Sequence, residues 1–229
     1  MPSRQKTLMF LSGFFASIGS FSVICVVLGT QNWISSVIVY KDDSSNGTVY
    51  ITYGLFEGVS EKEKLNGGGF SERAEPFQVL KRLEGTGSPE AVHILIITLL
   101  ALGLLCSAMS SGITMYNSVS NPYQDCFGPI GLYTWSAING FFSFLAMILF
   151  VVNTEACKQP SKLAHNKYNR IELLDAQNSY GYPFWLLLLI IILNIATIVI
   201  VYFYQHARYS KKKKQQRPME SESKDVILF

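Results

Sequence analysis

The sequence predicts an all-α membrane fold: a bundle of four transmembrane helices with a small β-sheet in the first extracellular loop. Three observations lead to this fold class. They are four long apolar segments, the lack of charged residues inside them, and a strand-like pattern in the first long connection. The expected spans are residues 8–28, 93–115, 132–152 and 184–204. Crossing a bilayer takes about 20 apolar residues in a helix. Because lipid offers the backbone no hydrogen-bond partners, unbroken apolar runs of this length are expected to be helices.

The first apolar segment is expected to stay in the protein as a span. A signal peptide has an apolar region of about 7–15 residues followed by a small-residue cleavage site. Here the run is longer, and Gly29-Thr30-Gln31-Asn32 is a poor cleavage site. Only 15% of the residues are charged, against about 25% in soluble domains. The composition therefore predicts one membrane domain and no separate catalytic domain.

Basic residues near the ends of the chain predict that both termini are cytosolic. Lys and Arg collect on the cytosolic side of spans, and they occur at Arg4, at Lys6 and repeatedly after the last span. An even number of spans places both ends on one side. The expected order is a cytosolic N-terminus (1–7), span 8–28, extracellular loop 29–92, span 93–115, cytosolic loop 116–131, span 132–152, extracellular loop 153–183, span 184–204 and a cytosolic tail (205–229).

One sequon supports this orientation. Asn46-Gly47-Thr48 is an N-glycosylation acceptor, and it lies in the first extracellular loop. The basic residues of the second extracellular loop argue against this orientation; they are Lys158, Lys162, Lys167 and Arg170. We expect Asn46 to carry a glycan and the protein to reside in the plasma membrane.

The cysteines predict no internal disulfide outside the membrane. Cys25 and Cys106 lie in spans, and Cys157 is the only cysteine in an extracellular loop. Cys157 could pair between chains or remain a free thiol. Cys126 lies in the cytosolic loop beside the membrane, so it is a candidate for palmitoylation, with a plain free thiol as the alternative.

The first extracellular loop carries a hairpin pattern. Residues 34–40 are rich in β-branched side chains, residues 48–56 alternate in part, and Asn46-Gly47 between them favours a tight turn. Residues 57–76 are charged and Gly-rich and are predicted to form a loop. Residues 77–83 are expected to form a short strand or helix.

Small and amide residues in the spans predict how the helices meet. Gly13, Gly103 and Gly140 allow close approach among the first three helices. Asn139 and Asn194 are the most polar residues in the middle of a span. We expect each to hydrogen-bond between helices, with a pore lining as the alternative.

The sequence favours a non-enzymatic protein without cofactors or metals. His93, His165 and His206 lie on different segments, and no catalytic or phosphate-binding motif is present. His93 is expected at the water interface, in a structural or interfacial role. No ionisable residue lies inside a span, which argues against an autonomous channel or transporter. The lipid bilayer, and not nucleic acid, is the expected environment.

The tail carries two interaction signals. A basic cluster follows the last span and is expected to anchor the topology and attract anionic lipid; it consists of Lys211, Lys212, Lys213 and Lys214. The chain then ends in Val-Ile-Leu-Phe. PDZ domains capture such an end as an added strand, in which Ile227 and Phe229 would point the same way. The alternative is an apolar end resting on the membrane.

Several segments resemble the clarin family. They are the start Met1-Pro2-Ser3, the blocks Tyr53–Phe56, Asn121–Tyr123 and Gly128–Tyr133, and the apolar C-terminus. Clarins are small glycosylated four-span proteins. Some members are associated with mechanosensory hair bundles, synapses and hearing. The resemblance implies a role in organising membrane complexes linked to actin.

A wider similarity extends to the claudins. Trp33 followed by Gly54-Leu55-Phe56 is similar to the Trp…Gly-Leu-Trp pattern of that superfamily. The similarity implies a left-handed bundle in which Trp33, Gly54, Leu55 and Phe56 anchor the extracellular sheet on the membrane. The chain lacks the two claudin loop cysteines and has Phe for the second Trp, which weakens the case for a sealing role.

These observations predict a non-enzymatic multi-pass organiser of membrane complexes. Its expected partners are membrane proteins and cytosolic PDZ scaffolds, with a homo-oligomer as a further candidate. The alternatives are a claudin-like cell–cell adhesion or barrier protein, and an auxiliary subunit of an ion channel.

Overall fold

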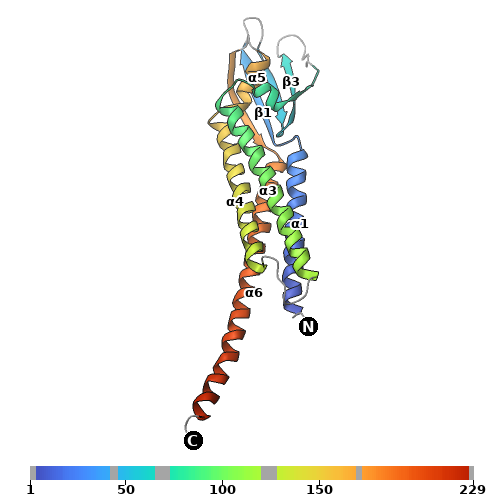
Figure 1. Ribbon diagram of the computed structural model, residues 1–229. Helices are drawn as coiled ribbons and strands as arrows, with labels where there is room; N and C mark the ends of the chain where they lie inside the picture. Colours follow the sequence, from blue (N-terminus) through green and yellow to red (C-terminus); the bar gives the residue numbers. More distant parts are fainter. Residues whose placement is uncertain (1–3, 42–45, 65–72, 120–127, 169–171, 227–229) are drawn as a thin grey trace.

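A four-helix bundle capped by a β-sheet is the architecture of the chain. The computed structural model describes residues 4–41, 46–64, 73–119, 128–168 and 172–226. In this part of the chain, four helices are long and apolar enough to span a membrane: α1 (Arg4–Gly29), α3 (Ser88–Val119), α4 (Gly128–Glu155) and α6 (Tyr182–Val226). The sheet covers one end of the bundle and both termini lie at the other (Figure 1). The predicted fold class is confirmed; the left hand of the bundle remains a prediction.

The four long helices form a ring in which each packs mainly against two others. The adjacent pairs are α1 with α3, α3 with α4, α4 with α6, and α6 with α1. Helix α6 continues well past the ends of the other three (Figure 1). Its apolar part covers Tyr182–Ala207. The helix thus begins close to the expected start of the last span and extends through most of the expected tail.

The sheet at the end of the bundle has five antiparallel strands within the described residues, in the order β4-β3-β2-β1-β5. They are β1 (Ile34–Lys41), β2 (Asn46–Tyr53), β3 (Glu57–Lys64), β4 (Glu75–Gln78) and β5 (Glu172–Tyr180). The predicted hairpin is confirmed in its two strands, because Lys41 pairs with Asn46 and Ile34 with Tyr53. The predicted turn at Asn46-Gly47 is wrong, since both residues already belong to β2, and this strand ends at Tyr53 and not at residue 56.

The loop predicted for residues 57–76 is wrong over its two ends, which form β3 and the start of β4. The inward positions of β3 are Gly58, Ser60 and Lys62, all buried. Hydrophobic alternation therefore cannot reveal this strand. The amine of Lys62 lies 4.6 Å from the ring centroid of Tyr40, so its charge meets an aromatic face instead of water.

Two short helices cover the inner face of the sheet. They are α2 (Val79–Leu83), which directly follows β4, and α5 (Gln159–Lys167), which comes from the second loop. The core beneath the sheet joins both helices to the strands and the bundle. Residues 77–83, expected as a strand or a helix, belong to both β4 and α2.

Strand β5 comes from the second loop, so the sheet is built from both loops. It pairs with β1 from Ile34–Tyr180 to Lys41–Glu172. The Glu155 carboxylate at the end of α4 accepts hydrogen bonds from the Tyr180 hydroxyl (3.0 Å) and the Asn178 amide (3.2 Å). Burial and this carboxylate raise the pKa of the Tyr180 hydroxyl, which keeps it protonated as a donor.

Candidate functional site

The junction between the sheet and the bundle contains most of the predicted anchor residues. Trp33 lies just after α1 and is completely buried. Its indole nitrogen donates to the Val27 carbonyl at 2.9 Å, and its ring centroid lies 4.9 Å from that of Phe150 on α4. Its backbone amide also donates to the Tyr53 carbonyl at 3.1 Å. This one residue therefore contacts α1, α4 and the end of β2.

Position 54 in the junction requires glycine, because the segment that follows α1 passes too close to it for a side chain to fit. A Cβ there would collide with the Thr30 carbonyl oxygen and lie 2.8 Å from Cα of Gln31. The neighbouring Leu55 is fully buried, whereas the side chain of Phe56 is 45% exposed. Three of the four predicted anchor residues are thus buried where the sheet meets the helices, and the Phe56 ring is on the surface.

A buried chain of hydrogen bonds starts at the Leu55 carbonyl oxygen, which lies 2.8 Å from Nε2 of His93. Gln159 Nε2 lies 3.1 Å from Nδ1 of the same ring. An amide nitrogen can only donate, so Nδ1 accepts and Nε2 carries the proton that is donated to Leu55. Asn153 then donates to Gln159 Oε1 at 3.0 Å and to the Pro89 carbonyl at 3.1 Å.

This chain of bonds joins α3, α4, α5 and the turn after β2. His93, Asn153 and Gln159 are all fully buried. His93 is structural, as expected, but it is not at the water surface. Sequence reasoning missed Asn153 and Gln159, because amide side chains give no signal of their partners. Both ring nitrogens of His93 and the Gln159 amide have partners, while Asn153 Oδ1 is a buried acceptor without one among the described residues.

A second polar cluster lies inside the bundle. The Asn139 amide donates to the Ser20 hydroxyl at 3.0 Å and to Asn194 Oδ1 at 3.3 Å. The hydroxyls of Ser17 and Ser110 meet at 2.8 Å. These contacts link α1 with α3, α4 and α6, so the predicted interhelical bonds of both asparagines are present. Such bonds are worth about 0.6 kcal/mol each on average.

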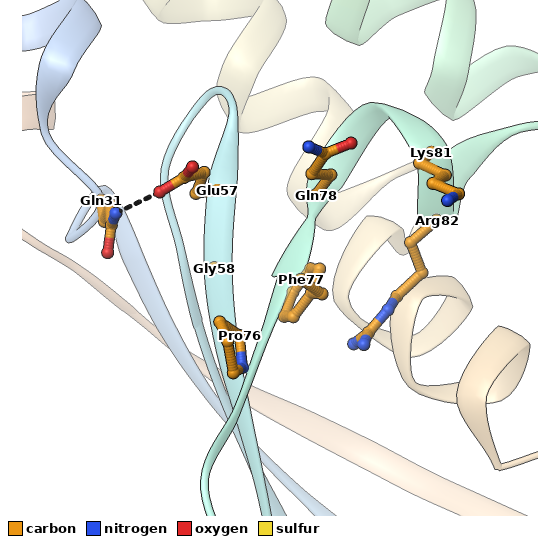
Figure 2. A pocket seen from close by; sticks show the side chains of 8 residues that line it. All are labelled: Gln31, Glu57, Gly58, Pro76, Phe77, Gln78, Lys81 and Arg82. Carbon is orange, nitrogen blue, oxygen red and sulfur yellow. Dashed lines mark hydrogen bonds between the residues drawn. The ribbon is translucent and has the colours of Figure 1, made fainter.

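An open groove of about 560 Å³ lies at one side of the sheet. Figure 2 shows Gln31 and Glu57 on one side of it, with Lys81 and Arg82 across from them beyond Phe77. Gln31 donates to Glu57 Oε2 at 2.6 Å. The guanidinium carbon of Arg82 lies 3.5 Å from the ring centroid of Phe77. Sequence reasoning did not predict this groove, since its residues come from three separated segments.

An ion pair holds α5 to the strand that borders the groove. Lys167 Nζ lies 2.6 Å from Glu75 Oε2. The hydrogen bond and charge of Lys167 hold the pKa of the Glu75 carboxyl below its usual range. Because this carboxyl is exposed, the pair contributes little to stability.

The remaining predicted sites lie at the edges of the described structure. Asn46 is the first residue of β2 and pairs with Lys41 at the end of β1. The basic cluster Lys211–Lys214 lies within α6. Cys126, Ile227 and Phe229 lie outside the described residues. Among the residues that are described, no group of three His, Cys, Asp or Glu side chains could hold a metal ion.

Comparison with known proteins gives consistent matches. A family model described as Clarin-2-like matches residues 4–201. The chain is 48% identical to Clarin-3 of Homo sapiens and 49% identical to Clarin-3 of Mus musculus, each over 229 residues and 100% of both chains. It is 26% identical to Clarin-1 of Homo sapiens over 204 residues, which cover 82% of this chain and 83% of the relative.

Proposed function

The chain belongs to the clarin family, and from that premise we propose that this four-span membrane protein organises membrane complexes without enzymatic activity. The observation that carries the proposal is the junction. Trp33 and the His93 hydrogen bonds fix the sheet to the helices that cross the membrane. The sheet thereby forms a platform on one side of the membrane. This platform is connected to the part of α6 beyond the span, the α6 arm, on the other side of the membrane.

The platform faces the outside of the plasma membrane in this proposal, and both termini lie in the cytosol. The basic residues that follow the last span support this orientation, as does the sequon at Asn46. The sheet then offers a surface to extracellular or membrane partners. Trp33, Gly54 and Leu55 fix its position, and Phe56 adds an exposed ring beside the junction.

The cytosolic arm recruits scaffolds. Helix α6 continues past the membrane through the cluster Lys211–Lys214, which holds the arm near anionic lipid. Palmitoylation of Cys126 would add a second contact with the same leaflet. At the end of the arm, Ile227 and Phe229 fill the pocket of a PDZ domain. By analogy with the family, the scaffolds connect to actin-based structures, in sensory cells among others.

Tail variants of the full-length protein test this proposal. In a pull-down with immobilised purified PDZ domains, Ile227→Ala and Phe229→Ala abolish capture, because both side chains point into the pocket. The matched control Leu228→Ala points the other way along the strand and retains capture. If all three variants are captured equally, the C-terminus is not the recruiting element.

Localisation in polarised epithelial cells separates the organiser from its alternatives. We expect the full chain to concentrate in an actin-rich apical zone, and a chain without residues 226–229 to spread evenly. Equal concentration of both at cell–cell borders would favour claudin-like adhesion through the sheet. An altered current from a co-expressed channel that does not depend on residues 226–229 would favour an auxiliary channel subunit.

A further inference from the structure

The groove at the side of the sheet lies close to the membrane surface. The apolar span of α1 ends at Gly29, and Gln31 at the edge of the groove is only two residues further along. Extended chain covers at most about 3.6 Å per residue, so Gln31 lies within about 7 Å of the end of the span. The polar layer of each leaflet is roughly 5 to 8 Å thick. With the span ending at Gly29, the Gln31 edge of the groove therefore falls within the headgroup layer.

Opposite charges lie on the two sides of the groove: Figure 2 shows the Glu57 carboxylate turned toward Gln31, and Lys81 and Arg82 on the far side of Phe77. On one side is the exposed carboxylate of Glu57, whose Oε2 accepts the bond from Gln31. On the other are Lys81, which is exposed, and Arg82, which is half-buried against Phe77. No described residue forms an ion pair with Lys81. The groove thus offers a cationic side and an anionic side to one ligand.

We propose that this groove binds the headgroup of a zwitterionic phospholipid from the leaflet on the sheet side. The phosphate lies against Lys81 and Arg82, and the ammonium group lies against Glu57. A volume of about 560 Å³ is within the usual range of small-ligand pockets. This site adjoins the junction at Gln31 but is formed by other side chains. The proposal does not depend on which partner the tail recruits.

A peptide added as a strand fits this groove less well. The groove is bordered by β4, which is an edge strand of the sheet. Pro76 lies in the middle of β4 and has no backbone N–H to donate. Proline at an edge strand prevents continued pairing. The lipid headgroup, which needs charges and not backbone donors, is therefore the occupant.

Lipid retention by the full-length protein tests the site. The protein is purified in detergent with equal amounts of phosphatidylcholine and phosphatidylglycerol, and bound lipid is counted by native mass spectrometry. Wild type retains mainly phosphatidylcholine. Lys81→Gln lowers retention of both lipids about fivefold, because one charge contact is lost. Glu57→Gln lowers the ratio of phosphatidylcholine to phosphatidylglycerol about fivefold, because the ammonium loses its partner while the phosphate site remains.

Two controls match these changes. Lys41→Gln and Glu63→Gln remove charges near the opposite end of the β1–β2–β3 sheet and leave both amounts unchanged; thermal unfolding verifies that all four variants are folded. Identical retention by all four variants and wild type would overturn the proposal, since the lipid would then be a non-specific coat. Binding of glycerophosphocholine as tight as that of phosphatidylcholine would also overturn it, because the ligand would then be a soluble phosphodiester.

Discussion

At the scale of single residues, the junction depends on polar groups that are buried away from water. His93 uses both ring nitrogens, one to accept from Gln159 and one to donate to the Leu55 carbonyl. Burial makes these bonds important, because a donor or acceptor left unpaired in the interior costs about 1–3 kcal/mol. The sequence identifies the histidine, but its partners are 38 and 66 positions away in the chain.

His93→Leu should destabilise the protein by about 2–5 kcal/mol. Leucine fills much of the space but leaves the Leu55 carbonyl and the Gln159 amide without partners. The measurement is thermal unfolding of the full-length protein in detergent. His165→Leu is the matched control, since His165 is exposed on α5, and surface changes usually stay within about 0.5 kcal/mol. Equal melting temperatures for the two variants would show that the buried bonds contribute nothing.

At the scale of elements, the faces of one helix differ in the side-chain size that they tolerate, and α3 is an example. Gly103 is buried against α4, where a Cβ would lie 2.9 Å from Asn139 Oδ1. Gly112 on the same helix is exposed and has nothing within 4 Å of an added Cβ. Two glycines that look equivalent in the sequence therefore have unlike roles, because only one contacts a neighbouring helix.

Gly103→Val is expected to destabilise the bundle by about 1–3 kcal/mol, because overpacking displaces Asn139 from its bonds to Ser20 and Asn194. Gly112→Val changes the same residue type on the lipid-facing side and should leave stability unchanged or slightly higher. Thermal unfolding of both variants in one detergent provides the comparison. A larger loss for Gly112→Val would contradict this assignment of the two faces.

At the scale of the whole molecule, the sheet is shared by two loops. Strand β1 pairs with β2 from its own loop and with β5 from the other. This pairing couples α1 and α3 to α4 and α6 at one end of the bundle, outside the membrane. The sheet therefore links the two loops at this end of the bundle, and the orientation of the chain decides which compartment the sheet faces.

Glycosylation reports that orientation. Asn46→Gln and Thr48→Ala should each remove a mass shift that is sensitive to PNGase F in expressing cells, because each destroys the sequon. Thr48→Ser preserves the acceptor and should keep the shift, which separates loss of the glycan from loss of the strand. A wild-type protein without a PNGase-sensitive shift would argue that the sheet does not enter the secretory lumen.

The sequence alone determined the four spans and the first hairpin. A helix in lipid satisfies its backbone within a short stretch of chain, so length and hydropathy are enough to predict it. The β1–β2 hairpin is also local, since it joins two neighbouring strand-like runs, although Asn46 and Gly47 lie in β2 and not in the turn. The interhelical roles of Asn139 and Asn194 followed from their cost in lipid, although their partners did not.

Only the tertiary structure decided β3, β5, the His93 bonds and the groove. Strand β3 has Gly58, Ser60 and Lys62 at its buried positions, so its pattern is not hydrophobic. Strand β5 pairs with residues more than 130 positions earlier in the chain. The physical reason is the same in each case: these features depend on contacts between distant segments, and such contacts exist only once the bundle has brought the two loops together.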